Sequence, residues 1–111
     1  MPELPEVETT KEGLKKDLEG QKILKIQLSN KKLRFPYNKN FIKNITGKYI
    51  LSVTRRAKYI LFDLSNDMKI ISHLGMSGSY RIIPKKNFNN ASKIKHDHFL
   101  LHTEEFVAIY N

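Results

Sequence analysis

The spacing of apolar residues predicts one helix near the start of the chain. From residue 5 to residue 18 they recur near one helical face and are followed by a different pattern. Pro5 suits a first helical turn, Glu6 and Glu8 complement the positive end of the helix dipole, and Gly20 supplies a C-terminal stop. The residues on the predicted buried face, including one just before the helix, are Leu4, Val7, Leu14 and Leu18.

After Gly20 the apolar residues alternate with a period of two, which is typical of strands. The segments are short, rich in Ile, Leu, Val, Phe and Tyr, and separated by turn residues. They cover residues 23–28, 49–54, 58–64, 68–74, 79–83, 98–102 and 106–110. Turn residues at 65–67 and 103–105 predict hairpins between their neighbours. We therefore expect an α+β fold class, with an N-terminal helix packed on a two-layer, largely antiparallel β-sandwich.

Three other segments change this picture only locally. Residues 41–45 fit a short helical turn, and residues 85–95 are polar, basic and rich in Asn, which predicts a mobile loop. The sequence finishes on an apolar strand, residues 106–110, with no polar tail after it. This pattern predicts a fragment, or a product that lacks a downstream module.

The composition indicates a single domain, residues 1–111. A chain of 111 residues with 40% hydrophobic residues can bury one modest core. It has no cysteine, which excludes disulfides and thiolate metal sites within this sequence. No apolar run approaches the roughly 20 residues of a membrane span. The opening MPELPEVE carries acids where a signal peptide needs basic residues, so we expect a cytoplasmic protein.

The distribution of charge favours a polyanionic partner. Lys and Arg number 20 against 11 Asp and Glu, a formal charge of +9. Residues 1–19 hold six acids and three lysines, so the other 17 cations face only five acids over residues 20–111. A folded domain with this bias typically binds nucleic acid. The alternative is a solvated surface that only favours solubility.

The N-terminus is itself a candidate chemical group. Removal of the initiator Met would leave Pro2 as a secondary amine, which is a nucleophile. An α-amino group titrates near pH 8, about two units below lysine, so part of it is unprotonated at neutral pH. Glu3 and Glu6 are three residues apart, and a helical turn would bring them to one side for acid–base work. The alternative is that both only complement the helix dipole.

Four short segments resemble the signature segments of bacterial formamidopyrimidine-DNA glycosylases, in the same order and at similar spacing. They are MPELPEVET at the N-terminus, RRAKY at 55–59, HLGMSG at 73–78 and KHDH at 95–98. The resemblance covers essentially the whole chain and corresponds to the N-terminal catalytic domain of that family. Leu4 favours this family over its sister, endonuclease VIII, which typically opens MPEGPE.

The resemblance implies a DNA-repair glycosylase and abasic-site lyase that acts on oxidised purines such as 8-oxoguanine and formamidopyrimidines. In the family the N-terminal proline, here Pro2, attacks C1′ of the damaged nucleotide and forms a Schiff base. Glu3 inherits the role of proton donor or acceptor at the sugar, and Glu6 that of holding the terminus and sugar. Lys58 inherits contact with a DNA phosphate and assistance to β-elimination; without the motif it would be a solvated lysine.

The resemblance also implies DNA-binding residues. Met76 corresponds to the methionine that enters the space left by the flipped nucleotide, and an unbranched, polarizable side chain suits such a wedge. His96 corresponds to a residue that binds the DNA backbone, and Lys95 beside it suits phosphate. His96 and His98 alternate onto one strand face, but two imidazoles without a third ligand do not make a metal site, so we expect no metal. We expect His73 to be structural, and Arg55 and Arg56 to be fold or surface residues.

Parts of the family pattern have no counterpart in these residues. The family continues with an Asp-Pro-Arg-Arg-Phe-Gly segment, a helix-two-turns-helix module and a four-cysteine zinc finger, so we expect no cofactor in this chain. The expected partner is damaged double-stranded DNA, bound by a monomer as in the family or together with a separate C-terminal half. Two alternatives stay open: a non-catalytic basic β-domain that binds nucleic acid, and one half of a split enzyme.

Overall fold

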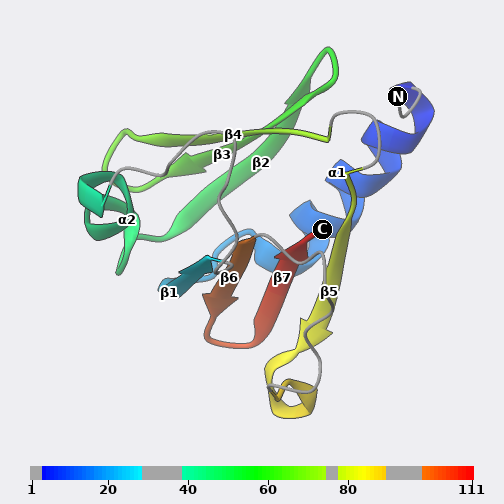
Figure 1. Cartoon of the computed structure of the whole chain (residues 1–111). Coiled ribbons are helices and arrows are strands. Elements are labelled where there is room, and N and C mark those ends of the chain that lie inside the picture. The colour runs from blue at the N-terminus through cyan, green and yellow to red at the C-terminus, as the bar shows by residue number, and fades with distance from the viewer. Residues whose placement is uncertain (1–3, 29–38, 75–77, 90–98) are drawn as a thin grey trace.

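The computed structural model describes residues 4–28, 39–74, 78–89 and 99–111, and predictions for other residues lie outside these ranges (Figure 1). The elements follow the order predicted from the sequence. They are α1 (Leu4–Leu18), β1 (Ile23–Leu28), α2 (Lys39–Ile45), β2 (Ile50–Arg56), β3 (Tyr59–Leu64), β4 (Lys69–His73), β5 (Tyr80–Pro84), the short 3₁₀-helix η1 (Lys85–Asn87), β6 (Phe99–Thr103) and β7 (Phe106–Tyr110).

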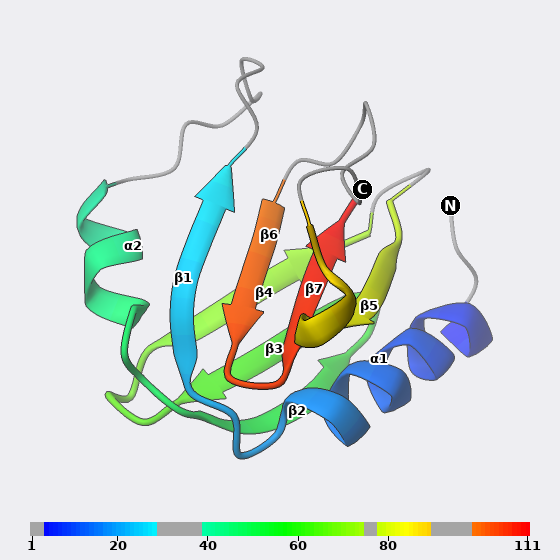
Figure 2. The same cartoon turned by 90° about the horizontal axis from the view of Figure 1, so that it is seen from below.

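The strands form two antiparallel sheets, one above the other. One sheet has four strands in the order β1-β6-β7-β5, and the other has three in the order β2-β3-β4. Figure 2 shows β2, β3 and β4 crossing behind the four-stranded sheet, with α1 beside both. The expected α+β fold, an N-terminal helix on a two-layer antiparallel sandwich, is confirmed.

The predicted hairpins are also confirmed. β3 pairs with β4 across the turn at residues 65–67, and β6 pairs with β7 across residues 104–105. Strand ends differ from the predictions by at most two residues, and β1 and β7 match them. These errors are small because the alternation of buried and exposed residues defines the body of a strand better than its ends.

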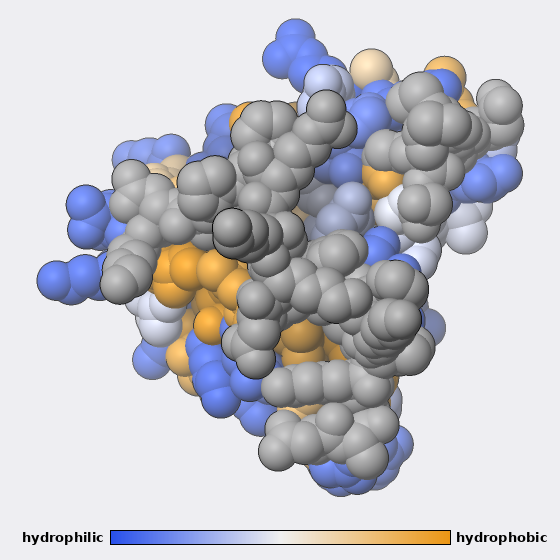
Figure 3. Space-filling model, viewed as in Figure 1, coloured by the Kyte–Doolittle hydropathy of each residue, from blue (hydrophilic) through white to orange (hydrophobic). Residues whose placement is uncertain are grey.

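Helix α1 buries the predicted face except at its first residue, because Leu4 lies at the open end of the helix and is 45% exposed. Val7, Leu14 and Leu18 are each at most 1% exposed and join the core between the two sheets. The helix packs mainly against β2. The same core contains large, fully buried residues from the strands and from the segments that connect them. They are Ile23, Ile45, Ile50, Val53, Ile60 and Leu64. Figure 3 shows apolar residues between the layers and hydrophilic residues around the rim.

The mobile loop predicted over residues 85–95 is wrong in its first part. Residues 85–87 form η1, and Phe88 after it packs on the face of the four-stranded sheet that points away from the main core. There Phe88 contacts the cluster of Leu100, Val107 and Ile109, and its ring meets that of His102 edge-on at 5.2 Å. One aromatic residue therefore anchors a segment whose other residues are polar.

Candidate functional site

The RRAKY segment forms the tip of the β2–β3 hairpin. Arg56 pairs with Tyr59, so only Ala57 and Lys58 make the turn. Ala57 has φ 52°, in the left-handed region that residues with a side chain adopt at a cost. Lys58 is therefore presented at the end of a rigid ladder rather than within a strand, and its side chain is partly buried.

Arg55 connects this tip to helix α1. Its Nε donates to Glu8 Oε1 at 2.7 Å, and its Nη1 donates to the Ala57 carbonyl at 3.0 Å. Glu8 also pairs with Lys11 Nζ at 2.8 Å, one turn along the helix. Hydrogen bonds from Arg55, above all, and from Lys11 lower the pKa of Glu8 to about 2. The carboxylate is therefore charged at any physiological pH.

A second carboxylate holds the other end of α1. Glu19 Oε2 accepts the Val53 backbone amide of β2 at 2.8 Å and Lys15 Nζ at 2.8 Å. These hydrogen bonds, that of Lys15 first, lower the pKa of Glu19. The helix is thus tied to β2 near both of its ends, which fixes where α1 begins relative to the hairpin.

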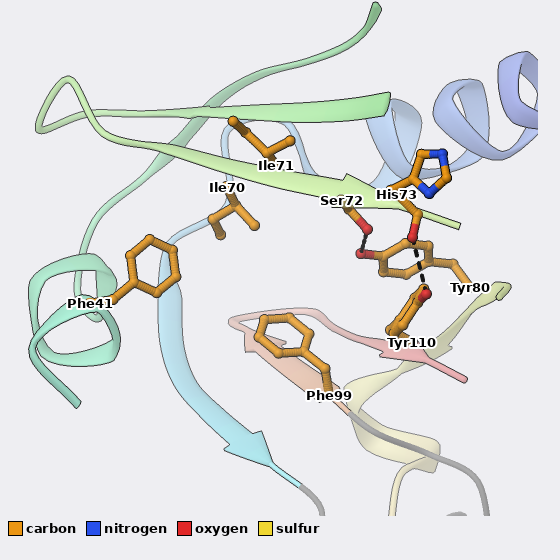
Figure 4. A pocket seen from close by; sticks show the side chains of 8 residues that line it. All are labelled: Phe41, Ile70, Ile71, Ser72, His73, Tyr80, Phe99 and Tyr110. Atoms are coloured by element: carbon orange, nitrogen blue, oxygen red, sulfur yellow. Dashed lines mark hydrogen bonds between the residues drawn. The ribbon is translucent and has the colours of Figure 1, made fainter. Parts of the chain in front are cut away.

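The HLGMSG segment begins beside the same hairpin. His73 pairs with Tyr59 across β3 and β4, and the two rings lie 4.8 Å apart. The Gly78 amide donates to the Leu74 carbonyl at 2.7 Å, which closes the connection around residues 75–77 at its base. The Tyr110 hydroxyl of β7 donates to the His73 carbonyl at 3.1 Å (Figure 4). The first described residues of the segment, His73 and Leu74, are therefore held from both sheets.

A hollow of about 250 Å³ lies between the sheets beside β4 (Figure 4). Apolar residues line most of it, among them Phe41 and Ile70. Its hydroxyl groups bond within the protein: Ser72 and Tyr80 lie 2.7 Å apart, and Tyr110 bonds to the end of β4. The hollow is smaller than the roughly 300–1,000 Å³ of typical ligand pockets, so we do not take it as the site.

The structure describes two of the residues predicted as catalytic. Glu6 is exposed in the first turn of α1, and Lys58 lies at the hairpin tip. Five other predicted site residues lie outside the described ranges: Pro2, Glu3, Met76, Lys95 and His96.

The elements that flank these residues share one edge of the molecule. The start of α1 and the hairpin tip lie on the same side in Figures 1 and 2. The end of β4 lies against the hairpin through the pairing of Tyr59 with His73. Phe99, the first residue of β6, pairs with Tyr110, which bonds to the end of β4. The described residues next to the four motif segments therefore lie at this edge or are joined to it through Tyr110.

One group of the site has a larger role than its position in the sequence predicts. Glu8 is predicted to complement the helix dipole, but it forms an ion pair with Arg55, 47 residues away in sequence. His73, for which a structural role is predicted, is exposed on β4 and packs its ring on Tyr59 beside the hairpin tip.

The described residues hold neither a cluster of metal-ligating side chains nor a helix that could cross a membrane. Within the described ranges no three His, Asp or Glu side chains are grouped so that they could hold a metal ion. The alternative metal ligands His96 and His98 lie outside those ranges. Neither α1 nor α2 is long and apolar enough to cross a membrane.

Comparison with known families and proteins identifies the fold. The family model of the formamidopyrimidine-DNA glycosylase N-terminal domain matches residues 1–111. Formamidopyrimidine-DNA glycosylase of Bartonella bacilliformis is 47% identical over 105 residues, covering 91% of this chain and 36% of that protein. The Agrobacterium fabrum protein of the same name is 42% identical over 125 residues, covering 100% of this chain and 42% of that protein.

Solved structures agree with this. A complex of Lactococcus lactis Fpg with DNA containing N7-benzyl-Fapy-dG superposes with a TM-score of 0.85 at 37% identity, covering 98% of this chain and 39% of that one. A complex of the same protein with DNA containing an abasic site gives 0.85 at 36% identity, with the same coverage. The chain spans about two fifths of the length of these relatives. By its sequence and its fold, it belongs to the formamidopyrimidine-DNA glycosylase family, whose N-terminal domain it matches throughout.

Proposed function

We propose that this chain supplies the nucleophile and the elimination-assisting lysine of a DNA glycosylase and abasic-site lyase that acts on oxidised purines. The observation that carries the proposal is that the described residues flanking the four signature segments gather toward one edge. There α1 and β4 adjoin the hairpin tip that presents Lys58, and Tyr110, which pairs with the first residue of β6, bonds to the end of β4. Relatives named formamidopyrimidine-DNA glycosylase, and their complexes with lesion-containing DNA, support the substrate class.

The proposed nucleophile is the secondary amine of Pro2 after removal of Met1. Pro2 precedes the first residue of α1 by two positions, so covalent geometry keeps their α-carbons within about 7 Å. The anchoring of α1 on β2 therefore restricts where the amine can be. Glu6, exposed in the first turn, is the described carboxylate nearest to it in sequence.

The proposed reaction proceeds by transfer of electron pairs at one sugar. The amine nitrogen bonds to C1′ while the C1′–N9 bond breaks, and the departing purine takes up a proton. Loss of the amine proton and opening of the C1′–O4′ bond, with a proton delivered to O4′, give an iminium. That cation acidifies C2′–H, so removal of this proton breaks the C3′–O bond and releases the 3′ phosphate. In this proposal Glu3 acts as proton donor or acceptor at the sugar.

Lys58 is proposed to neutralise the phosphate at the site of elimination. Lys58 lies in a two-residue turn beyond the last paired residues of the strands and is partly exposed, so a backbone phosphate that approaches the tip can contact it. Its ammonium group lowers the energy of the departing phosphate dianion. The amine, carboxylates and lysine of the chain supply this chemistry without a cofactor.

Borohydride trapping tests this proposal. The 111-residue chain, with loss of Met1 confirmed by mass, is incubated with a duplex containing 8-oxoguanine and with one containing an abasic site, then reduced. A covalent adduct that peptide mapping assigns to Pro2 is the expected result. In a Pro2→Glu control the larger second residue retains Met1 and displaces the amine, so the adduct at position 2 should be lost, and peptide mapping distinguishes it from any imine formed by the Met1 amine.

The outcomes separate the candidate functions. An adduct on Pro2 with either duplex supports amine catalysis, and comparison of the two shows whether base removal accompanies it. DNA binding without an adduct, after confirmed loss of Met1, would overturn the proposal in favour of a non-catalytic nucleic-acid-binding domain. An adduct that forms only after addition of the C-terminal part of a relative would support the split-enzyme alternative.

A further inference from the structure

Two groups of the proposed reaction come from different elements of the fold. The amine belongs to the segment that leads into α1, and Lys58 belongs to the β2–β3 tip. Their separation therefore depends on how the hairpin tip is held against the helix. Misplacement of a reacting group by about 1 Å can cost on the order of 100-fold in rate.

A chain of polar contacts connects these two elements. Glu8 of α1 accepts from Arg55 Nε at 2.7 Å, and Arg55 Nη1 donates to the Ala57 carbonyl at 3.0 Å. The guanidinium is planar and rigid, so its two bonds fix the direction from the helix to the turn. The second bond ends on the residue directly before Lys58.

The turn needs such support because Ala57 adopts φ 52°. A residue with a Cβ persists in the left-handed region only when the surrounding structure holds it there. Arg55 is part of that surrounding structure, since it bonds to the carbonyl of the same residue. Without that bond, we expect the two-residue turn to sample other conformations and to carry Lys58 with it.

We propose that Arg55, held by Glu8, is a positioning residue that sets Lys58 relative to the start of α1. This inference rests on the proposed function for its catalytic consequence, but its structural part stands on the contacts alone. Arg55 itself touches neither substrate nor reacting atoms. It acts through the Ala57 carbonyl.

Arg56 provides a matched control. It is the adjacent arginine of the same strand, it is exposed, and alternation along β2 directs its side chain to the opposite face. Its side chain makes no ion pair or hydrogen bond with the residues that the structure describes. Arg56→Met thus removes the same charge and length as Arg55→Met without breaking the contact chain.

The catalytic test compares two steps with an abasic duplex: adduct formation on the amine and strand cleavage by elimination. Arg55→Met is expected to slow cleavage about 10- to 100-fold and to change adduct formation much less. Arg56→Met should leave the ratio of the two steps unchanged. In a Lys58→Gln background, Arg55→Met should cause no further loss of cleavage, because Arg55 acts through that lysine.

The structural test does not depend on activity. Backbone amide order parameters at Ala57 and Lys58, measured by NMR, are expected to fall in Arg55→Met and in Glu8→Gln and to stay unchanged in Arg56→Met. Arg55→Lys, which keeps the charge but loses the planar fork, should show an intermediate fall and serves if Arg55→Met does not fold. An unchanged tip in folded Arg55 variants overturns the inference, even if the wild-type chain proves inactive.

The combined outcomes distinguish the two proposals. A mobile tip in the Arg55 variants with no adduct from the wild-type chain would support the contact chain and overturn the proposed function. An active wild type whose cleavage responds equally to Arg55→Met and Arg56→Met would overturn the positioning role alone. Multiplicative losses in the double variant with Lys58→Gln would also overturn it.

Discussion

The Tyr110 hydroxyl donates to the backbone carbonyl of His73 at 3.1 Å and thereby connects the end of β7 to the end of β4 (Figure 4). The two residues belong to different sheets and lie 37 positions apart in sequence. The same hydroxyl lies 3.4 Å from the Leu74 carbonyl, so it serves both residues that precede the connection at 75–77. One side chain therefore joins the two layers where a signature segment begins.

Tyr110→Phe is expected to destabilise the fold by about 0.5–1.5 kcal/mol, the typical net value of one such hydrogen bond. The ring, which lies 5.2 Å from that of Tyr80, would remain, so the change isolates the hydroxyl. Urea unfolding at equilibrium measures the difference. Tyr49→Phe is the control. Tyr49 is 46% exposed and lies at the end of the β2–β3 hairpin that is away from its tip. Equal stability of the two variants would contradict the assigned role.

Gly78→Ala is expected to be more disruptive than its size indicates. A Cβ at this position would lie 2.0 Å from the Leu74 carbonyl oxygen and 2.6 Å from the Tyr110 hydroxyl, so Gly78 would have to move away from Leu74 and Tyr110. We expect a loss of about 1–3 kcal/mol, as for other overpacked sites. Gly13→Ala, at an open position within α1, should instead stabilise by about 0.5–1 kcal/mol. Thermal unfolding of both variants tests whether Gly78→Ala lowers the stability of the fold and Gly13→Ala raises it.

The sequence predicted the elements well because hydrophobic spacing is a local property. The face of α1 with Val7, Leu14 and Leu18, and the period of two along the strands, follow directly from it. The hairpin tip was harder, since Ala57 and Lys58 are not typical turn residues, and Lys58 was predicted to start a strand. Ala57 has a left-handed φ, and its carbonyl accepts a hydrogen bond from Arg55; neither feature can be recognised from the residue type alone.

The contacts that organise the site could not be predicted in the same way. The ion pair of Glu8 with Arg55 joins positions 47 apart, and only the packing of α1 on β2 brings them together. The sequence does identify both as charged, but charge alone does not choose a partner. The segment around η1 was likewise predicted to be a loop because its composition is polar, although Phe88 directly after η1 packs on the four-stranded sheet.

The lowered pKa of Glu8 predicts how stability depends on pH. Its folded value of about 2 lies below the ordinary value of 4.5, so the ionised carboxylate favours the folded state. That contribution is complete above about pH 4.5 and is lost as the pH falls toward 2. Glu19 and Asp63 shift in the same direction, so they add to this acid sensitivity.

Glu8→Gln should therefore reduce the loss of stability between pH 5 and pH 2, because the variant has no carboxylate to protonate at this position. Urea unfolding at several pH values gives the slope for each protein. Glu104→Gln removes one exposed carboxylate in the β6–β7 turn and should leave the slope near that of the wild type. A wild-type slope in Glu8→Gln would show that the ion pair with Arg55 does not stabilise the fold.

The chain assayed by itself is expected to cleave abasic DNA weakly and to excise 8-oxoguanine far more slowly than a full-length relative. It spans 36–42% of its relatives, and the resemblance assigns further phosphate contacts to the rest of such proteins. Loss of several contacts together lowers affinity by orders of magnitude. An abasic site offers the sugar carbon without base recognition, so the amine can still react. Single-turnover assays on both duplexes measure this, and excision of 8-oxoguanine at the rate of a full-length relative would contradict it.

Lys58→Gln is expected to change the salt dependence of DNA binding. If Lys58 contacts one phosphate, its removal should lower the slope of log affinity against log salt by about one and weaken binding to all sequences alike. Lys86→Gln, in the exposed part of η1, removes the same charge far from the hairpin tip and should change affinity only slightly. Fluorescence anisotropy with an abasic duplex at several salt concentrations gives both slopes. If the two variants have equal slopes, Lys58 acts only through the net charge of the protein, and the phosphate contact proposed for the hairpin tip is wrong.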